Sequence, residues 1–184
     1  VLIGKILDEL KEQKLAHNTI VILVSDHGYN LQEHTQWAKF TSYNTSTQVP
    51  LVIYNPFSKA KGTTNALTSL VDIYPTIAEL CGLRIPENQL DGISLAPVLN
   101  NPNLEGKSHV FIKKAKAFTI KTRSFSYTEF IKPEDNTIID KMLYDHKISK
   151  AENINIVNKM EFKNTVSELN YILHSEYQKN IVGF

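Results

Sequence analysis

The stretch Thr19-Ile20-Val21-Ile22-Leu23-Val24-Ser25-Asp26-His27-Gly28 is an apolar run that stops abruptly at Asp-His-Gly. Its β-branched and aliphatic residues predict a buried strand over 19–25 that delivers Asp26 and His27 to its C-terminal end. In open α/β sheets, ligands bind at that end of the strands. Gly28 permits the sharp turn out of the strand. We therefore expect a binding site immediately after this strand.

The flanking sequence places this strand in an α/β arrangement. Residues 1–15 carry apolar side chains at helical spacing, which predicts an amphipathic helix that covers a sheet. A helix, a short loop and an apolar strand form half of a βαβ unit, so we expect a parallel sheet. A second buried strand is predicted over 49–56. A helix follows within 66–81, starting properly near Pro75 and ending at Gly82.

The hydrophobic pattern of the sequence changes after residue 106. Short runs with β-type alternation predict a small antiparallel sheet, and they cover 109–112, 117–123, 125–131 and 142–145. The tail from about 153 to 181 is predicted to be helical, with a break near Asn164. We therefore expect two regions, 1–106 and 107–184. Val1 falls inside the first helix, so we expect the chain to be the C-terminal portion of a longer protein.

Composition excludes several classes of protein. The 184 residues have a net charge of +1 with scattered Lys and Arg, which argues against a nucleic-acid binder. The sequence contains no run of eighteen apolar residues, so no transmembrane helix is predicted. The single cysteine, Cys81, excludes an intrachain disulfide and a cysteine-based zinc site, and its setting predicts a core residue at the end of a helix.

Asp26 and His27 are candidate metal ligands. Where the backbone turns at a strand end, a carboxylate and an imidazole can converge on one ion, although adjacent residues on a regular strand point to opposite faces. This pair suits Zn²⁺ or Mn²⁺ well and Ca²⁺ acceptably in a mixed site. The structural alternative is that Asp26 caps the following turn and His27 is a surface residue.

The polar and aromatic loop over 26–48 carries the candidate substrate contacts. The Lys39 ammonium suits a sulfate or phosphate oxygen, against the alternative of an ordinary surface lysine. His34 and Glu33 are further candidates. His34 would contact the anion, act as an acid to the leaving group or make a structural hydrogen bond. Trp37 would stack on substrate or, more in keeping with its type, form the core of the loop.

These motifs resemble a known family. Ser25-Asp26-His27-Gly28, followed by Leu31-x-Glu33-His34-x-x-Trp37-Ala38-Lys39, is similar to the sulfatase branch of the alkaline phosphatase superfamily, with iduronate-2-sulfatase-type enzymes as the nearest likeness. Further matching motifs follow in the family's order over nearly the whole chain: Thr47-x-Val49-Pro50-Leu51, Leu70 to Leu83, Leu90 to Leu95, Ile120 to Arg123 with Tyr127, Leu143-Tyr144-Asp145, and Glu152-Asn153.

The resemblance implies a fold and a partial site. The fold would be the C-terminal part of an α/β/α sandwich, followed by a small antiparallel sheet with a C-terminal helix. Asp26 and His27 would bind a metal, by likeness Ca²⁺, and Lys39 would contact the sulfate. His34 lies in the matching loop and is carried over less firmly. The family acts outside the cytosol, so a periplasmic, secreted or lysosomal location is expected.

The departures from the family limit what this chain is expected to do alone. The nucleophile motif, whose cysteine or serine becomes formylglycine, does not occur in these residues, and Cys81 is followed by Gly82. Gln32 stands where a glycine is more usual. We expect a sulfatase acting on a sulfated sugar or polysaccharide, with no turnover by the chain alone. The alternatives are a phosphodiesterase or phosphonate monoester hydrolase of the same superfamily, and a non-catalytic module that retains the fold.

Overall fold

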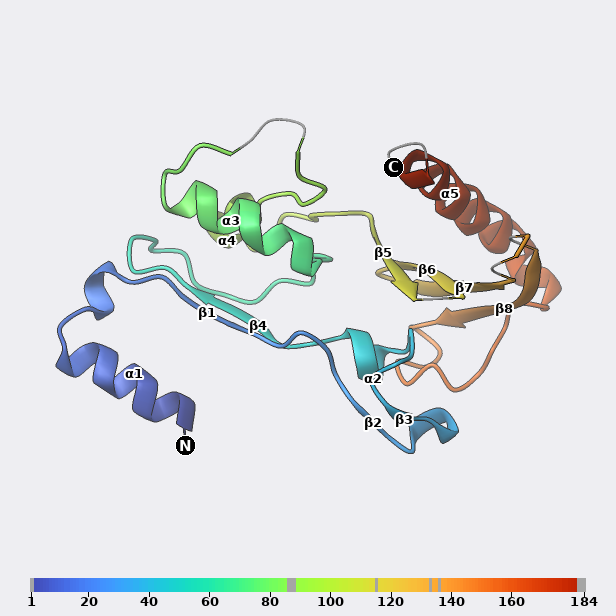
Figure 1. Ribbon diagram of the computed structural model, residues 1–184, viewed down its shortest axis with the longest axis horizontal. Helices are drawn as coiled ribbons and strands as arrows, with labels where there is room; N and C mark the ends of the chain where they lie inside the picture. Colours follow the sequence, from blue (N-terminus) through green and yellow to red (C-terminus); the bar gives the residue numbers. More distant parts are fainter. Residues whose placement is uncertain (1, 86–88, 115, 133, 136, 182–184) are drawn as a thin grey trace. The chain divides into compact units, whose positions relative to one another are not determined.

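The computed structural model describes residues 2–85, 89–114, 116–132, 134–135 and 137–181, with side chains up to residue 176 (Figure 1). The chain divides into two compact units. The first unit contains residues 1–26 and 49–106, and the second contains residues 27–48 and 107–184. The first unit ends at residue 106, and residues 27–48 cluster with the second unit and not with the first.

The first unit begins with a helix and a two-stranded sheet. Helix α1 (Leu2–Glu12) and a 3-10 turn, η1 (Ala16–Asn18), precede strand β1 (Val21–Val24), as the periodicity predicts. Strand β4 (Leu51–Tyr54) pairs with β1 in antiparallel register, with Val21 opposite Tyr54. The expectation of a parallel pairing here is therefore wrong. No long helix crosses over between the two strands in the described residues 25–50, and parallel neighbours need such a crossover.

Burial in this sheet is lower than the apolar sequence predicts. The side chains of β1 and β4 are half-buried or exposed, and Val52 is 57% exposed. Among the described strands, β1 and β4 pair only with each other, so each has an edge without a neighbouring strand. Helix α1 likewise contains no buried residue, although it was expected to cover the sheet.

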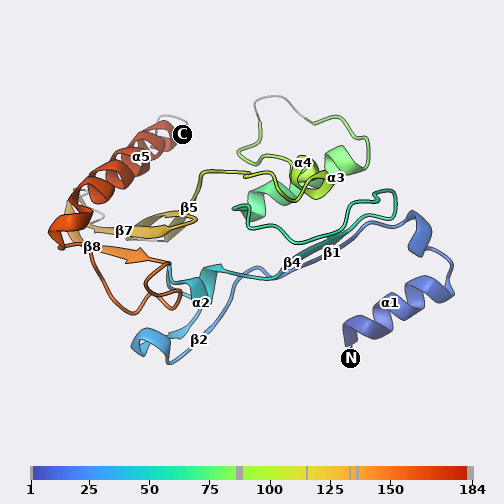
Figure 2. The same cartoon turned by 180° about the vertical axis from the view of Figure 1, so that it is seen from behind.

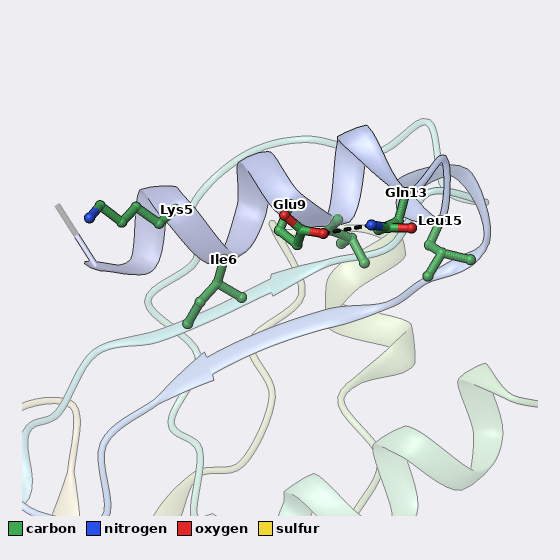
Figure 3. A pocket seen from close by; sticks show the side chains of 6 residues that line it. Lys5, Ile6, Glu9, Gln13 and Leu15 are labelled. Carbon is green, nitrogen blue, oxygen red and sulfur yellow. Dashed lines mark hydrogen bonds between the residues drawn. The ribbon is translucent and has the colours of Figure 1, made fainter.

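One face of α1 forms a shallow apolar hollow of about 440 Å³ (Figure 3). The side chain of Gln13 donates a 2.7 Å hydrogen bond to Glu9 at its rim. The lining comes entirely from α1 and the turn after it: Lys5, Ile6, Glu9, Leu10, Gln13 and Leu15. None of the candidate site residues lines this hollow.

The helices after β4 are held by two buried polar side chains. The 3-10 turn η3 (Leu70–Asp72) leads into α3 (Ile73–Leu80), with Pro75 in its first turn, and α4 (Ala96–Asn100) follows. The Asp72 carboxylate accepts hydrogen bonds from the backbone of Ser69 and Ile93, at 2.8 and 2.9 Å. The Thr76 hydroxyl accepts one from the Leu95 amide at 2.8 Å. Both residues are fully buried, so they fix the connection to α4 against α3.

Helix α3 ends as the sequence predicts. Gly82 adopts a φ of 65°, the left-handed conformation that glycine favours. The amide of Leu83 bonds to the carbonyl of Ala78 and that of Gly82 to the carbonyl of Glu79, which is a Schellman motif. Cys81 caps the helix, but its side chain is exposed. The prediction of a core cysteine is therefore wrong, because Cys81 lies on the same exposed helix face as Tyr74 and Ile77.

The second unit contains the main hydrophobic core. Strands β5 (His109–Lys114), β6 (Ala117–Thr122), β7 (Phe125–Ile131) and β8 (Ile138–Asp145) form an antiparallel sheet in sequential order. After a 3-10 turn, η4 (Met160–Phe162), helix α5 (Lys163–Ile181) packs on β6 and β7 (Figures 1 and 2). The break near Asn164 thus corresponds to the junction of η4 with α5. The fully or almost fully buried core side chains are Ile120, Tyr127, Leu143, Ile156, Leu169 and Leu173.

The segment 27–48 contributes short elements to the second unit. Strands β2 (Asn30–Leu31) and β3 (Trp37–Ala38) form a small hairpin around a 3-10 turn, η2 (Glu33–Thr35). One helical turn, α2 (Asn44–Thr47), follows. The predicted loop is therefore ordered by local pairing. Across the described parts of the chain, no helix combines the length and apolar character needed to cross a bilayer.

Candidate functional site

His27 and Lys39 lie in direct contact. The Lys39 Nζ is 2.8 Å from His27 Nε2, and His27 Nδ1 is 2.7 Å from the backbone carbonyl of Gly28. A carbonyl only accepts hydrogen bonds, so Nδ1 must carry the proton that it donates. Nε2 therefore presents its lone pair, and the ammonium of Lys39 donates to it. This is the tautomer that an imidazole needs to bind a metal through Nε2, with its other nitrogen fixed by a backbone carbonyl.

The backbone around His27 is fixed by a close approach of two segments. The Gly28 amide donates a 2.8 Å hydrogen bond to the carbonyl of Ser46. A Cβ at Gly28 would lie 2.0 Å from the carbonyl oxygen of Thr45, so no other residue fits without a shift of backbone. The glycine of the Asp-His-Gly motif thus lets the backbone at residue 28 lie close against α2.

Asp26 is exposed and lies two residues after the end of β1. Its carboxylate and the imidazole of His27 are donor types that divalent cations accept in proteins. Among the described residues, no group of three or more His, Cys, Asp or Glu side chains is placed to hold a metal ion. The donor chemistry of Asp26 and His27 fits a divalent cation, but a pair of ligands is short of the coordination number that Ca²⁺ requires.

His34 sits on a segment of unusual backbone. Four residues without the freedom of glycine have left-handed φ values: Gln32 (90°), His34 (54°), Thr35 (55°) and Ala38 (70°). Such conformations cost about 1–3 kcal/mol each and collect at functional segments. The His34 ring stacks on Tyr43, with ring centres 3.8 Å apart and planes 11° apart. The stacking fixes the imidazole.

Glu33 is bonded within its own turn, whereas Trp37 is exposed to solvent. The Glu33 carboxylate accepts a 2.5 Å hydrogen bond from the amide of Leu31, and hydrogen bonds from its own amide and that of Leu31 lower its pKa. Glu33 is therefore an ionised group that stabilises its own turn. Trp37 is 63% exposed, so its interpretation as the core of the loop is wrong. It lies on a two-residue strand whose partner, β2, is too short to cover an indole.

Asn30 is the centre of this segment, and no sequence pattern identified it. It is fully buried, and its amide nitrogen donates to the carbonyl of Ala38 at 2.7 Å and to the hydroxyl of Ser46 at 2.6 Å. Its amide oxygen accepts from the hydroxyl of Thr45. Asn30 therefore joins β2, β3 and α2. Its burial depends on contacts eight or more residues away, which composition does not reveal.

A buried ion pair joins α2 to the antiparallel sheet. Lys121 Nζ, on β6, donates to Asn44 Oδ1 at 2.7 Å and lies 3.3 Å from Glu152 Oε1. The other carboxylate oxygen of Glu152 accepts from the Asn44 amide at 2.6 Å. Burial opposes ionisation of Glu152, yet hydrogen bonds from His146 and Asn44 and the charge of Lys121 outweigh it and lower its pKa. These contacts explain why residues 27–48 cluster with the second unit.

Comparison with known proteins assigns the chain to a family. Residues 1–83 match the family model described as Sulfatase. An arylsulfatase K of Rattus norvegicus is 31% identical over 95% of this chain and 32% of its own length. An N-acetylglucosamine-6-O-sulfatase of Bacteroides thetaiotaomicron is 32% identical over 96% of this chain and 33% of its own length. The chain belongs to the sulfatase family.

A solved structure supports the same sulfatase assignment. A protein in complex with its substrate, D-glucosamine-2-N,6-O-disulfate, superposes with a TM-score of 0.86 and is 26% identical, over 98% of this chain and 38% of that one. The fold is thus that of the alkaline-phosphatase-like sulfatases, as expected. The chain spans about a third of the length of the curated sulfatases that it matches.

Sulfatases use a divalent metal and a formylglycine. In this chain, His27 and Asp26 have the chemistry to bind such a metal. Cys81 does not fit the formylglycine role, because it caps α3 and is followed by Gly82 in a left-handed turn. Several expectations stay predictions: the particular likeness to iduronate-2-sulfatase-type enzymes, the identity of the metal, the roles of the candidate site residues and the location of the protein.

Proposed function

We propose that the protein to which this chain contributes is a sulfate-ester hydrolase acting on a sulfated sugar. The observation that carries this proposal is the contact between Lys39 Nζ and His27 Nε2 at 2.8 Å. The Nε2 lone pair of His27 suits a cation and the Lys39 ammonium suits an anion, so the two groups together suit a metal ion beside a sulfate. The names of two relatives, a sulfatase of N-acetylglucosamine and a complex with a disulfated glucosamine, support an amino sugar as the substrate class.

In this proposal Asp26 and His27 are ligands of a divalent metal, by family likeness Ca²⁺. When bound, the metal would stabilise the negative charge that develops on the sulfate oxygens. The backbone carbonyl of Gly28 holds the His27 proton on Nδ1, so Nε2 stays available to a cation. In this structure the ammonium of Lys39 takes that position. Asp26 and His27 would hold the metal, and the Lys39 ammonium beside His27 would stabilise an oxygen of the sulfate ester.

His34 and Trp37 complete the proposed contacts with substrate. The stacking of His34 on Tyr43 presents an imidazole at a fixed angle, suited to hydrogen bonding the sulfate or to donating a proton to the leaving oxygen. Trp37 is exposed, as a residue that stacks on a sugar ring must be. The nucleophile does not come from these residues, so we propose that the chain alone has no turnover.

The proposal is tested by measuring sulfate release from sulfated N-acetylglucosamine with the complete protein. Lys39→Gln should lower kcat/KM by about a hundredfold or more, because a charge near the developing oxyanion is lost. The matched control is Lys59→Gln, an exposed lysine of the first unit, which should leave kcat/KM unchanged. Equal rates for the two variants would reject the role of Lys39.

Turnover assays with the same complete protein distinguish the sulfatase from the two alternative functions. A phosphodiesterase or phosphonate monoester hydrolase would turn over an aryl phosphodiester faster than an aryl sulfate. A non-catalytic module would turn over neither ester, while Asp26→Asn and His27→Ala would still weaken binding of Ca²⁺ measured by calorimetry. We expect the aryl sulfate to be the better substrate.

A further inference from the structure

A basic and aromatic patch adjoins Lys39 in the second unit. The Lys39 ammonium lies 6.0 Å from the centre of the Phe40 ring, and the Lys114 ammonium, at the end of β5, lies 5.6 Å from the same centre. Phe40 is 64% exposed, and both lysines are exposed. Two cations from segments more than seventy residues apart in the sequence therefore border one exposed aromatic ring.

This arrangement has an electrostatic consequence. Each ammonium gains from the face of the ring, but two like charges beside one ring also repel each other. An anion that lies near both ammonium groups removes this repulsion, so the patch favours an acidic ligand. Lys39 is already engaged at His27 Nε2 and is proposed for the scissile sulfate. Lys114 is the additional charge, and the proposed reaction does not use it.

We propose that Phe40 and Lys114 form a second anion-binding subsite that binds a neighbouring sulfate or carboxylate of the same saccharide. This inference rests on the proposed function, because it takes Lys39 as the contact of the scissile sulfate. Lys114 then selects substrates that carry a second acidic group beside the sulfate ester. Phe40 contributes by holding the Lys114 ammonium over its ring and by offering an apolar face to the sugar.

The neighbouring residue on β5 provides a matched control. Lys113 precedes Lys114 on the same strand, so its side chain leaves the opposite face of the sheet. Its ammonium lies 5.4 Å from the ring of Phe118 and not beside Phe40. Lys113→Gln and Lys114→Gln thus remove the same charge from adjacent residues, and only Lys114→Gln changes the patch at Phe40.

The test is calorimetric binding to the full chain at low ionic strength. The probes are glucosamine-6-sulfate, glucosamine-2-N,6-O-disulfate and a monosulfated disaccharide that contains a uronic acid. Lys114→Gln should weaken binding of at least one two-acid probe by about three- to tenfold and leave glucosamine-6-sulfate unchanged. Weaker binding of the disulfate would identify the group that Lys114 contacts as a sulfate. Weaker binding of the uronic acid probe would identify it as a carboxylate. Lys113→Gln should alter none.

Two outcomes overturn the inference. In the first, Lys114→Gln has no effect on binding of either two-acid probe. In the second, Lys114→Gln weakens binding of all three probes, glucosamine-6-sulfate included. The proposed function fails in a different way. If Lys39→Gln leaves binding of glucosamine-6-sulfate unchanged, the sulfate role of Lys39 is rejected. If Lys39→Gln weakens all probes but Lys114→Gln weakens none, only the second subsite is rejected.

Discussion

At the scale of single residues, Gln32 is the most informative departure from the family pattern. It takes a φ of 90° at the start of η2, a conformation in which a Cβ is strained and glycine is not. The family's usual glycine at this point therefore has a physical reason. The turn persists in this chain because its backbone hydrogen bonds, such as Gln32 to Gln36 at 3.0 Å, over-determine it.

Replacing Gln32 by glycine should therefore stabilise the chain. We expect a gain of about 0.5–1 kcal/mol in the free energy of unfolding, since the relief of strain exceeds the entropy that glycine loses on folding. Urea denaturation measures it. Gln36→Gly is the control, because Gln36 has an extended φ of −108° and should lose stability. A loss of stability in Gln32→Gly as large as that in Gln36→Gly would contradict the argument.

At the scale of elements, the contact of α2 with β6 centres on Lys121, which donates to Asn44 and Thr47 of α2 and forms an ion pair with the buried Glu152. The side chain of Lys121 is 8% exposed and that of Glu152 is 1% exposed. Lys121→Met leaves the Glu152 carboxylate buried without its cation, which should cost about 3 kcal/mol in urea denaturation. The double variant with Glu152→Gln should recover part of this loss. Lys147→Met, at an exposed position of the same unit, should cost almost nothing. A similar loss in both single lysine variants would indicate a general charge effect.

A second buried carboxylate fastens α5 to the sheet. Glu129 on β7 is 1% exposed, and it accepts hydrogen bonds from Tyr127 at 2.5 Å, Asn170 at 2.7 Å and His174 at 2.8 Å. Burial opposes its ionisation, but the hydrogen bonds from these three side chains outweigh burial and hold its pKa below the usual value.

The depressed pKa of Glu129 predicts a pH dependence with a definite sign. Its contribution to stability is complete above the unfolded pKa of about 4.3 and is lost as the pH falls through the lower folded pKa. Glu129→Gln should cost about 1–3 kcal/mol at pH 7, and the difference from the unsubstituted chain should shrink below about pH 4. Thermal unfolding between pH 3 and 7 measures it. A difference that stays constant over that range would show that the Glu129 charge is not involved.

Elements were predictable where local signals agreed. Pro75, Gly82 and the alternation after residue 106 predicted α3, its end and the four-stranded sheet, because each depends on residues close in sequence. The pairing of β1 with β4 and the exposure of both strands were not predictable, since they depend on which strands become neighbours. The site shows the same division. Motif spacing singled out His27 and Lys39, which the structure brings into contact, whereas Asn30 and Lys121 act through contacts distant in sequence.

At the scale of the whole molecule, stability is unevenly distributed between the two units. The fully buried core residues Ile120, Tyr127 and Leu143 all lie in the second unit, whereas α1 in the first unit has no buried residue. Burial of apolar side chains is the main source of stability, and an 11-residue helix without it is marginal in water.

Native-state hydrogen exchange should therefore separate the two units. We expect the amides of β6 and β7 to exchange only through global unfolding, because both strands are paired on each side within the sheet and packed against α5. The amides of α1 should exchange at least a hundredfold faster, through local opening of the helix. Mass spectrometry of peptides from residues 2–12 and 117–131 measures both. Protection of α1 equal to that of β7 would mean that its exposed apolar face is covered in solution, by self-association of the chain, and a concentration series would then lower that protection on dilution.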